Sequence, residues 1–182
     1  MTKTDSQDLK DVAETLLITL YARAYESQRP DAMLKDEKAV ALVKQINYDF
    51  SRARVQAHDE VAIIMRMREF DRFAREFLAR NPDAVVVHIG CGLDTRFERV
   101  NNGRVEWYDL DLPHVIRLRR ELMGDEIGRY HILSRSVFED DWLETVDIHR
   151  QRPILFLAEG VLPYFEETQV KSLFFKLRDK FP

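Results

Sequence analysis

The sequence predicts an α/β protein with a doubly wound, mainly parallel β-sheet and an N-terminal helical extension. Residues 1–81 carry only the hydrophobic spacing of helices, and short β-branched runs begin after Pro82. These runs are apolar at nearly every position, as in strands buried on both faces, and they alternate with helical segments. We therefore expect a helical cap over residues 1–81 and a sheet core over residues 82–182, together one structural domain.

Three helices are expected before the sheet. Apolar residues recur at helical intervals over 9–24, and this helix ends before the turn-rich segment 27–31. A shorter helix is expected over 37–46. The third helix has one apolar stripe over 63–78 and stops at Asn81, because the residue before a proline disfavours the helical conformation.

Four strands and four helices are expected after Pro82. The strands coincide with the short apolar runs 84–89, 105–109, 130–133 and 154–158. The helices follow them over 94–100, 113–123, 140–150 and 166–180. Pro113 suits the first turn of its helix, where a backbone N–H has no partner to lose.

Composition excludes several classes of protein. The 182 residues include 28 Lys and Arg against 32 Asp and Glu, a net charge of −4 that argues against nucleic-acid binding through bulk positive charge. The single cysteine cannot form an internal disulfide. The start of the chain is polar and acidic, and no apolar run is long enough to cross a membrane, so we expect a cytoplasmic protein. The five histidines lack metal-ligand spacing, and no metal is expected.

The loop after the first strand, Gly90-Cys91-Gly92, is a candidate ligand site. Ligands bind beyond the carboxyl ends of the strands in such sheets, and glycines let the backbone approach them closely. The third glycine of a dinucleotide fingerprint is replaced by Thr95, and Asp94 would repel a diphosphate while capping the next helix. A nucleoside without a diphosphate is therefore favoured over NAD. The alternative is a tight turn without a ligand.

Two acidic residues follow other strands. Asp111 comes about twenty residues after the glycine loop, the usual place for a carboxylate that accepts hydrogen bonds from ribose hydroxyls. The alternative is that Asp109 or Asp111 helps to start the next helix. Glu159 directly follows an apolar strand, so its carboxylate must reach solvent or meet a cation. For Glu159, a simple exit into a loop remains the alternative.

Several ordered segments together resemble the leucine carboxyl methyltransferase superfamily, in particular its bacterial branch of polyketide-type O-methyltransferases. The segments are VVHIGCGLDTRFERV at 86–100, EWYDLDLP at 106–113, LFLAEGVLPYF at 155–165, and upstream 15–39 and RMREFD at 66–71. The resemblance implies a Rossmann-like fold and transfer of a methyl group from S-adenosylmethionine to an oxygen of a small-molecule carboxylate or hydroxyl. The main alternative is a non-enzymatic or degenerate binding protein of the same fold.

The resemblance also implies a cofactor site without identifying a catalytic residue. The family's arginine for the cofactor carboxylate matches Arg66, which periodicity places at the edge of the apolar helix face, whereas Arg68 points away. A snorkelling surface arginine is the alternative. The acid for the ribose matches Asp111. The full set of implied cofactor-binding residues is Arg66, Gly90, Cys91, Gly92, Asp111, Leu112, Ser136, Val137, Glu159 and Gly160.

Two departures from the family pattern stand out. Ser136 and Val137 replace an Asp-Leu pair that meets adenine, and the family's sheet continues beyond residue 182, so we expect the sheet core to be incomplete. The strand 154–158 would then be an exposed edge that could pair with another chain, with the oligomeric state left open.

Arg23 and His88 have positions that favour structural roles. Arg23 is expected to be structural, as a cation near a helix C-terminus. His88 is expected to pack between layers. Without a histidine at a strand end, an acceptor that is already ionised is favoured.

Overall fold

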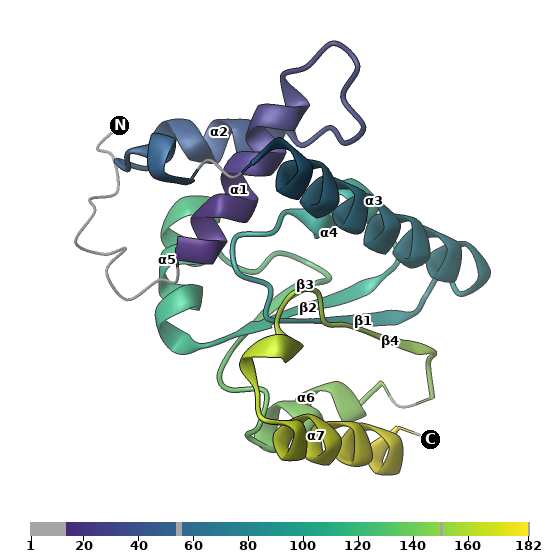
Figure 1. Ribbon diagram of the computed structural model, residues 1–182. Coiled ribbons are helices and arrows are strands. Elements are labelled where there is room, and N and C mark those ends of the chain that lie inside the picture. Colours follow the sequence, from purple (N-terminus) through teal and green to yellow (C-terminus); the bar gives the residue numbers. More distant parts are fainter. Residues whose placement is uncertain (1–13, 54–55, 150, 182) are drawn as a thin grey trace.

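The structure is a computed structural model that describes residues 14–53, 56–149 and 151–181. A four-stranded parallel sheet with strand order β3-β2-β1-β4 lies at its centre, with helices on both faces (Figure 1). The strands are β1 (Val85–Ile89), β2 (Glu106–Asp111), β3 (Tyr130–Ser134) and β4 (Ile154–Leu157). The expected fold class is confirmed, and β4 lies at one edge of the sheet.

The N-terminal helices are α1 (Glu14–Ser27), α2 (Glu37–Gln45) and α3 (Ala57–Arg80), with a 3-10 turn η1 (Phe50–Ala53) before α3. The expected residues 9–13 of the first helix lie outside the described residues. The Asp36 side chain caps α2 by accepting a hydrogen bond from Ala39 N. Helix α3 begins before the apolar stripe, with two acidic residues in its first turn that suit the helix dipole.

The remaining helices are α4 (Arg96–Val100), α5 (Pro113–Met123), α6 (Asp141–Asp147), η2 (Leu162–Tyr164) and α7 (Glu167–Lys180). The helix expected over 94–100 begins two residues later, at Arg96, and the expectation that Asp94 caps it is wrong. Thr95 is the N-cap residue and makes no side-chain cap, while the Asp94 carboxylate pairs with arginines of α4 itself. Helix α6 ends at Asp147, earlier than expected, and Arg150 lies outside the described residues.

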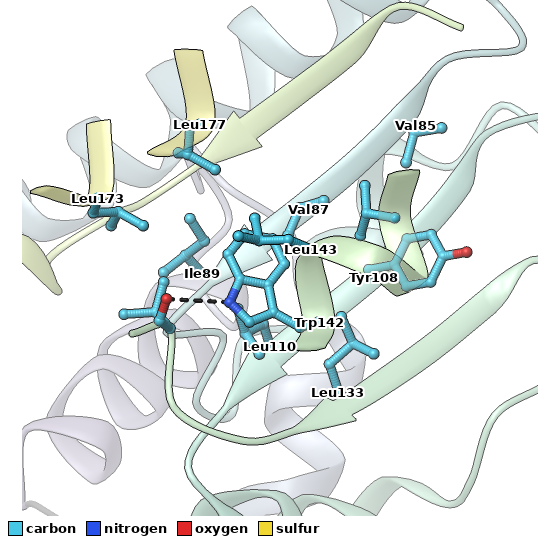
Figure 2. Close-up of a cluster of buried hydrophobic side chains, with 12 residues drawn as sticks. Val85, Val87, Ile89, Tyr108, Leu110, Leu133, Trp142, Leu143, Leu173 and Leu177 are labelled. Carbon is cyan, nitrogen blue, oxygen red and sulfur yellow. Dashed lines mark hydrogen bonds between the residues drawn. The ribbon is translucent and has the colours of Figure 1, made fainter. Parts of the chain in front are cut away.

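One face of the sheet is covered by α6 and α7, and this layer is apolar. Val87 and Leu110 project from β1 and β2 into a cluster around Trp142, which is fully buried (Figure 2). The indole Nε1 of Trp142 donates to the backbone oxygen of Val137, 3.1 Å away, so its one polar atom is satisfied.

The other face is covered by α3, α4 and α5. Successive residues of a strand point to opposite faces, so Val86 and His88 of β1 face this layer together with Trp107 and Asp109 of β2. His88 and Asp109 are paired across the two strands, and both are buried. Polar groups therefore enter the interior from the sheet on this face, near the carboxyl ends of the strands.

Helix α1 packs against α2, and both contribute to an apolar cluster with α5. Leu17 and Leu20 of α1 meet Leu93 of the loop after β1 and Leu118 of α5 in this cluster. The N-terminal helices therefore lie directly over the loop that follows β1 (Figure 1). Among the described helices, none is both long and apolar enough to span a bilayer.

Candidate cofactor and substrate site

A cavity of about 610 Å³ opens at the carboxyl ends of the strands, beneath α1 and α3. Its size lies within the usual range for small-molecule sites. The strand ends contribute His88, Ile89, Gly90, Leu110, Asp111, Leu112, Arg135, Ser136, Val137, Glu159, Gly160 and Val161. The helices contribute apolar groups, including Leu16, Ile18, Ile63 and Met67, and polar groups, including Thr15, Thr19, Arg23, Arg66 and His114. Eight of the ten residues implied by the resemblance line this cavity, and Cys91 and Gly92 do not.

The glycine loop is shaped by conformation and by close packing. Gly90 and Gly92 have φ angles of +67° and +50°, in the left-handed region that side chains disfavour. A Cβ on Gly90 would lie 2.7 Å from Cγ2 of Val161, and one on Gly92 would collide with Leu16. The φ angles therefore require glycine at both positions, and at Gly90 the packing against Val161 requires it as well, so the alternative of a tight turn accounts for part of this motif.

Cys91 lies in the core rather than in the cavity wall. Its side chain packs with Ile116 and Ile132, and burial raises the pKa of the thiol well above its ordinary value. A thiol in this environment is a small apolar residue and not a nucleophile.

The Asp111 carboxylate is held at the cavity wall by two backbone N–H groups. Oδ2 accepts from Gly92 N and Oδ1 accepts from Leu112 N, each at 2.7 Å. Each oxygen keeps a second lone pair for a ligand hydroxyl. Burial raises the pKa of the Asp111 carboxyl above its ordinary value. Because Leu112 is the N-cap residue of α5, Asp111 also supports the start of that helix.

Asp109 lies outside the cavity wall, in a buried polar cluster. Its carboxylate pairs with Arg119, accepts from Tyr130 Oη at 2.7 Å and Trp107 Nε1 at 2.8 Å, and lies 3.3 Å from Nδ1 of His88. Burial alone would raise the pKa of this carboxyl, but Arg119 and the hydrogen bonds hold it below its ordinary value. Asp109 therefore neither starts α5 nor lines the cavity.

Glu159 meets a cationic partner, one of the two outcomes expected for a carboxylate after a buried strand. Arg66 Nε donates to Glu159 Oε1 at 2.9 Å. The Glu159 side chain is 5% exposed, whereas that of Arg66 is 45% exposed at the cavity. A Cβ on Gly160 would lie 3.5 Å from Nη2 of Arg66, so the guanidinium passes directly over this glycine.

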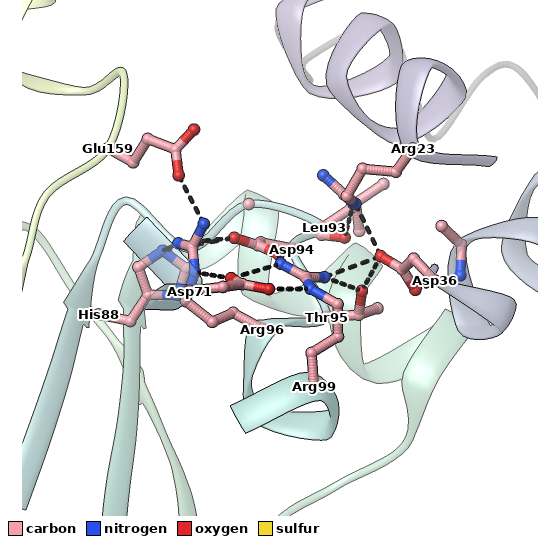
Figure 3. Close-up of polar contacts among 12 residues, drawn as sticks. Arg23, Asp36, Asp71, His88, Leu93, Asp94, Thr95, Arg96, Arg99 and Glu159 are labelled. Carbon is pink, nitrogen blue, oxygen red and sulfur yellow. Dashed lines mark hydrogen bonds and ion pairs between the residues drawn. The ribbon is translucent and has the colours of Figure 1, made fainter. Parts of the chain in front are cut away.

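A network of buried ion pairs extends from Glu159 to the N-terminal helices (Figure 3). Arg99 joins three acids, with Nε 2.7 Å from Asp71, Nη1 2.8 Å from Asp36 and Nη2 3.1 Å from Asp94. Burial would raise the pKa of the Asp94 carboxyl, but the neighbouring arginines hold it well below its ordinary value. Asp36, Asp71, Arg96 and Arg99 of this network were not predicted from the sequence. The one available signal was an aspartate within the apolar stripe of α3.

Arg23 belongs to the same network through contacts other than the expected one, and its side chain also lines the cavity. It is buried, pairs with Asp36 at 2.9 Å, and donates from Nη2 to the backbone oxygen of Leu93 at 2.7 Å. The position of Arg23 therefore depends on an ion pair and a loop carbonyl rather than on the C-terminal dipole of α1.

Two histidines line the cavity. His88 is buried between the sheet and α4, as expected, but it also forms part of the cavity wall, so the expectation that no histidine lines the site is wrong. His114, in the first turn of α5, lines the cavity as well, although the sequence analysis did not include it. Among the described residues, no group of His, Cys, Asp or Glu side chains has an arrangement suited to a metal ion.

Comparison with known proteins identifies the family. A family model described as leucine carboxyl methyltransferase matches residues 16–178. The tetracenomycin polyketide synthesis O-methyltransferase TcmP of Streptomyces glaucescens is 44% identical over 166 residues, covering 91% of this chain and 60% of that protein. The S-adenosyl-L-methionine-dependent methyltransferase dpfgK of Gibberella zeae is 35% identical over 187 residues, covering 95% of this chain and 62% of that protein.

A crystal structure described as that of a methyltransferase from Thermobifida fusca YX superposes with a TM-score of 0.55 at 20% identity, covering 88% of this chain and 62% of that one. This likeness supports the fold. The chain spans about three fifths of the length of the curated relatives, 60% of one and 62% of the other. With the family match extending over most of its residues, the chain belongs to the leucine carboxyl methyltransferase family.

Proposed function

We propose that this chain binds S-adenosylmethionine in the cavity and serves the transfer of its methyl group to an oxygen of a small-molecule acceptor, a carboxylate or a hydroxyl. The observation that carries the proposal is the joint presence of Asp111 and the Arg66–Glu159 pair in one cavity wall. A carboxylate suits a vicinal diol, and a guanidinium suits a carboxylate. The two relatives named above carry methyltransferase names.

The residues of the cavity divide into three groups toward this cofactor. Asp111 would accept the ribose hydroxyls, and Leu112, Ser136 and Val137 would pack around the adenine. Gly90 and Gly160 leave room for the methionine part, whose carboxylate Arg66 would hold. Gly92 would act indirectly, because its N–H positions the Asp111 carboxylate.

The bound cofactor supplies a methyl group that its sulfonium has already activated. The work of the protein is therefore to orient the acceptor and to keep water out. Ile18 of α1 and Ile63 and Met67 of α3 form apolar parts of the wall that suit this exclusion of water. Asp94, Asp111 and Glu159 are each engaged in the contacts described above, so an acceptor that arrives ionised needs the least from these groups.

Calorimetric titration of the full chain with S-adenosylhomocysteine tests the proposal. Asp111→Ala is expected to weaken binding by about 1.5–3 kcal/mol, or about ten- to a hundredfold in Kd, because hydrogen bonds to a charged group are lost. The matched control is Asp125→Ala, since Asp125 is exposed and pairs with Arg120 outside the cavity wall. Failure to bind S-adenosylhomocysteine, or equal binding of NAD, would contradict the proposal.

Methyl transfer is measured separately, with isotope-labelled cofactor and a panel of aromatic acids, phenols and amines. Label should appear on an acid or a phenol of the panel and should depend on Asp111. Transfer to nitrogen nucleophiles in preference to both would overturn the assignment to oxygen.

A further inference from the structure

We infer that Arg96 is a positioning residue of the cofactor site, acting through Glu159 to aim Arg66 into the cavity. The inference rests on the function proposed above. Arg96 is fully buried at the start of α4 and is not part of the cavity wall. Its influence on a ligand must therefore pass through the side chains that it holds.

The guanidinium of Arg96 joins three segments of the chain. Nε lies 2.7 Å from Asp71 of α3, Nη1 lies 2.9 Å from Asp94 in the loop after β1, and Nη2 lies 2.6 Å from Glu159 in the loop after β4. Every guanidinium nitrogen has a carboxylate partner. The position of Glu159 is thus defined relative to both α3 and the glycine loop (Figure 3).

Glu159, held in this way, fixes in turn the position of the Arg66 guanidinium. Its Oε2 is taken by Arg96, and its Oε1 accepts from Nε of Arg66 at 2.9 Å. Within the described part of the chain, the hydrogen bonds of Arg66 run through Nε. The terminal nitrogens therefore remain available as donors for a ligand carboxylate. A half-exposed arginine without such an anchor would lose more side-chain entropy on binding a ligand.

The arrangement also explains why Glu159 can be both buried and charged. A carboxylate that is 5% exposed needs close cations, and Arg66 alone is too exposed to supply this environment. Arg66 and Asp71 both belong to α3, so the chain Arg66–Glu159–Arg96–Asp71 closes on itself through that helix. Removing Arg96 opens the ring at a position that touches no ligand.

Titration with two probes tests the inference on the full chain. S-adenosylhomocysteine carries the amino-acid part that Arg66 would hold, and 5′-methylthioadenosine lacks it. Arg96→Lys is expected to weaken the affinity for S-adenosylhomocysteine about tenfold more than the affinity for 5′-methylthioadenosine, because a lysine cannot hold three carboxylates at once. Arg99→Lys is the matched control, because Arg99 pairs with Asp36, Asp71 and Asp94 but not with Glu159. It should change both affinities by the same factor.

The decisive comparison uses Arg66→Ala as the background. If Arg96 acts through Arg66, adding Arg96→Lys to Arg66→Ala should produce no further selective loss, that is, no further drop in the affinity for S-adenosylhomocysteine relative to that for 5′-methylthioadenosine. Should Arg96→Lys fail to fold, Glu159→Gln takes its place, with the same selective loss expected and the same absence of effect on the Arg66→Ala background.

An unchanged affinity ratio in Arg96→Lys, or the same selective loss in Arg99→Lys, would overturn the inference. So would a further selective loss on the Arg66→Ala background. In each of these cases the parent chain still binds S-adenosylhomocysteine, and the proposed function survives. A parent chain that binds neither probe would overturn the proposed function instead.

Discussion

The two faces of the sheet use alternate residues of the same strands, yet different interactions hold them to their helices. On the side of α6 and α7, Val87 and Leu110 pack against a buried tryptophan in an apolar layer. On the side of α3, α4 and α5, His88 and Asp109 lie among buried arginines and acids. The cavity lies at the ends of the strands and is lined by His88 from the polar face.

The difference indicates that the two faces have different roles: the apolar layer stabilises the fold, and the buried ion pairs position the loops around the cavity. Burial of apolar area stabilises a fold without specifying contacts in detail, whereas a buried ion pair contributes little net stability but has strict geometry. Arg96 and Arg99 therefore give the loops around the cavity a defined arrangement that an apolar layer would not impose. The predictions below test this separation, beginning with the largest effect.

On the apolar face, Trp142→Ala should lower the free energy of unfolding by about 3–5 kcal/mol, because it leaves a cavity and an unsatisfied carbonyl. Urea denaturation followed by circular dichroism measures the loss. Phe174→Ala on α7 is the control, since Phe174 is 57% exposed, and it should change stability by less than about 1 kcal/mol. Equal losses in the two variants would show that this layer is not the stabilising core.

On the polar face, Arg119→Met should lower the free energy of unfolding by about 3 kcal/mol, because it leaves the buried Asp109 carboxylate without its cation. The tyrosine and tryptophan bonds to Asp109 remain, which keeps the loss at the lower end of the usual range. Adding Asp109→Asn should recover most of the stability, since the uncompensated charge is removed. A double variant no more stable than Arg119→Met would mean that the lost hydrogen bonds from Arg119 to the backbone oxygens of Gly92 and Asp94, and not the uncompensated charge, account for the loss.

Low pH should reduce the contribution of the polar face to the free energy of unfolding more than that of the apolar face. The pKa values of Asp94 and Asp109 are lowered in the folded protein, so their contribution to stability is fully present above the unfolded value of 3.8 and is lost as the pH falls through the folded values. Urea midpoints measured from neutral pH down to pH 3 should fall steeply below about pH 4. The fall should be shallower in the Arg119→Met/Asp109→Asn variant. Trp142→Ala should keep the parent slope.

Binding should respond to acid before folding does. The pKa of Asp111 is raised by burial, and its carboxylate is the form that accepts ribose hydroxyls. The affinity for S-adenosylhomocysteine should therefore fall as the pH drops through this raised value, above the 3.8 of an ordinary aspartate. Asp111→Asn should bind more weakly at neutral pH and show a flatter profile. A profile identical to that of the parent would remove Asp111 from the ribose contact.

The smallest expected effect concerns His114. If the acceptor is already ionised, the single-turnover rate with an acceptor from the panel should be flat from about pH 6 to 9, and His114→Gln should change it less than about twofold. A rate that climbs tenfold per pH unit would indicate an acceptor that needs deprotonation. A loss of that climb in His114→Gln would then assign the base to this residue of the cavity wall.

Local patterns in the sequence were sufficient to predict the α-helices and the strands, but not the 3-10 turns η1 and η2. Proline at the first turn and apolar periodicity predict the helix over 113–123, which the structure places at Pro113–Met123. Asp111 and Glu159 were found because a polar residue after a buried strand is conspicuous. Helix ends such as those of α4 and α6 were less accurate, since caps depend on contacts made elsewhere.

The sequence by itself determined the sheet, its flanking helices and the strand ends that line the cavity, because these follow from the period of apolar residues and from local backbone preferences. Tertiary structure alone decided that Cys91 is core, that Asp94 is an ion-pair partner rather than a cap, and that Arg96 joins Asp71 to Glu159. The physical reason is distance along the chain. A buried charge needs a partner, but its sequence position does not say which one, and the partners here come from α3, the glycine loop and the end of β4.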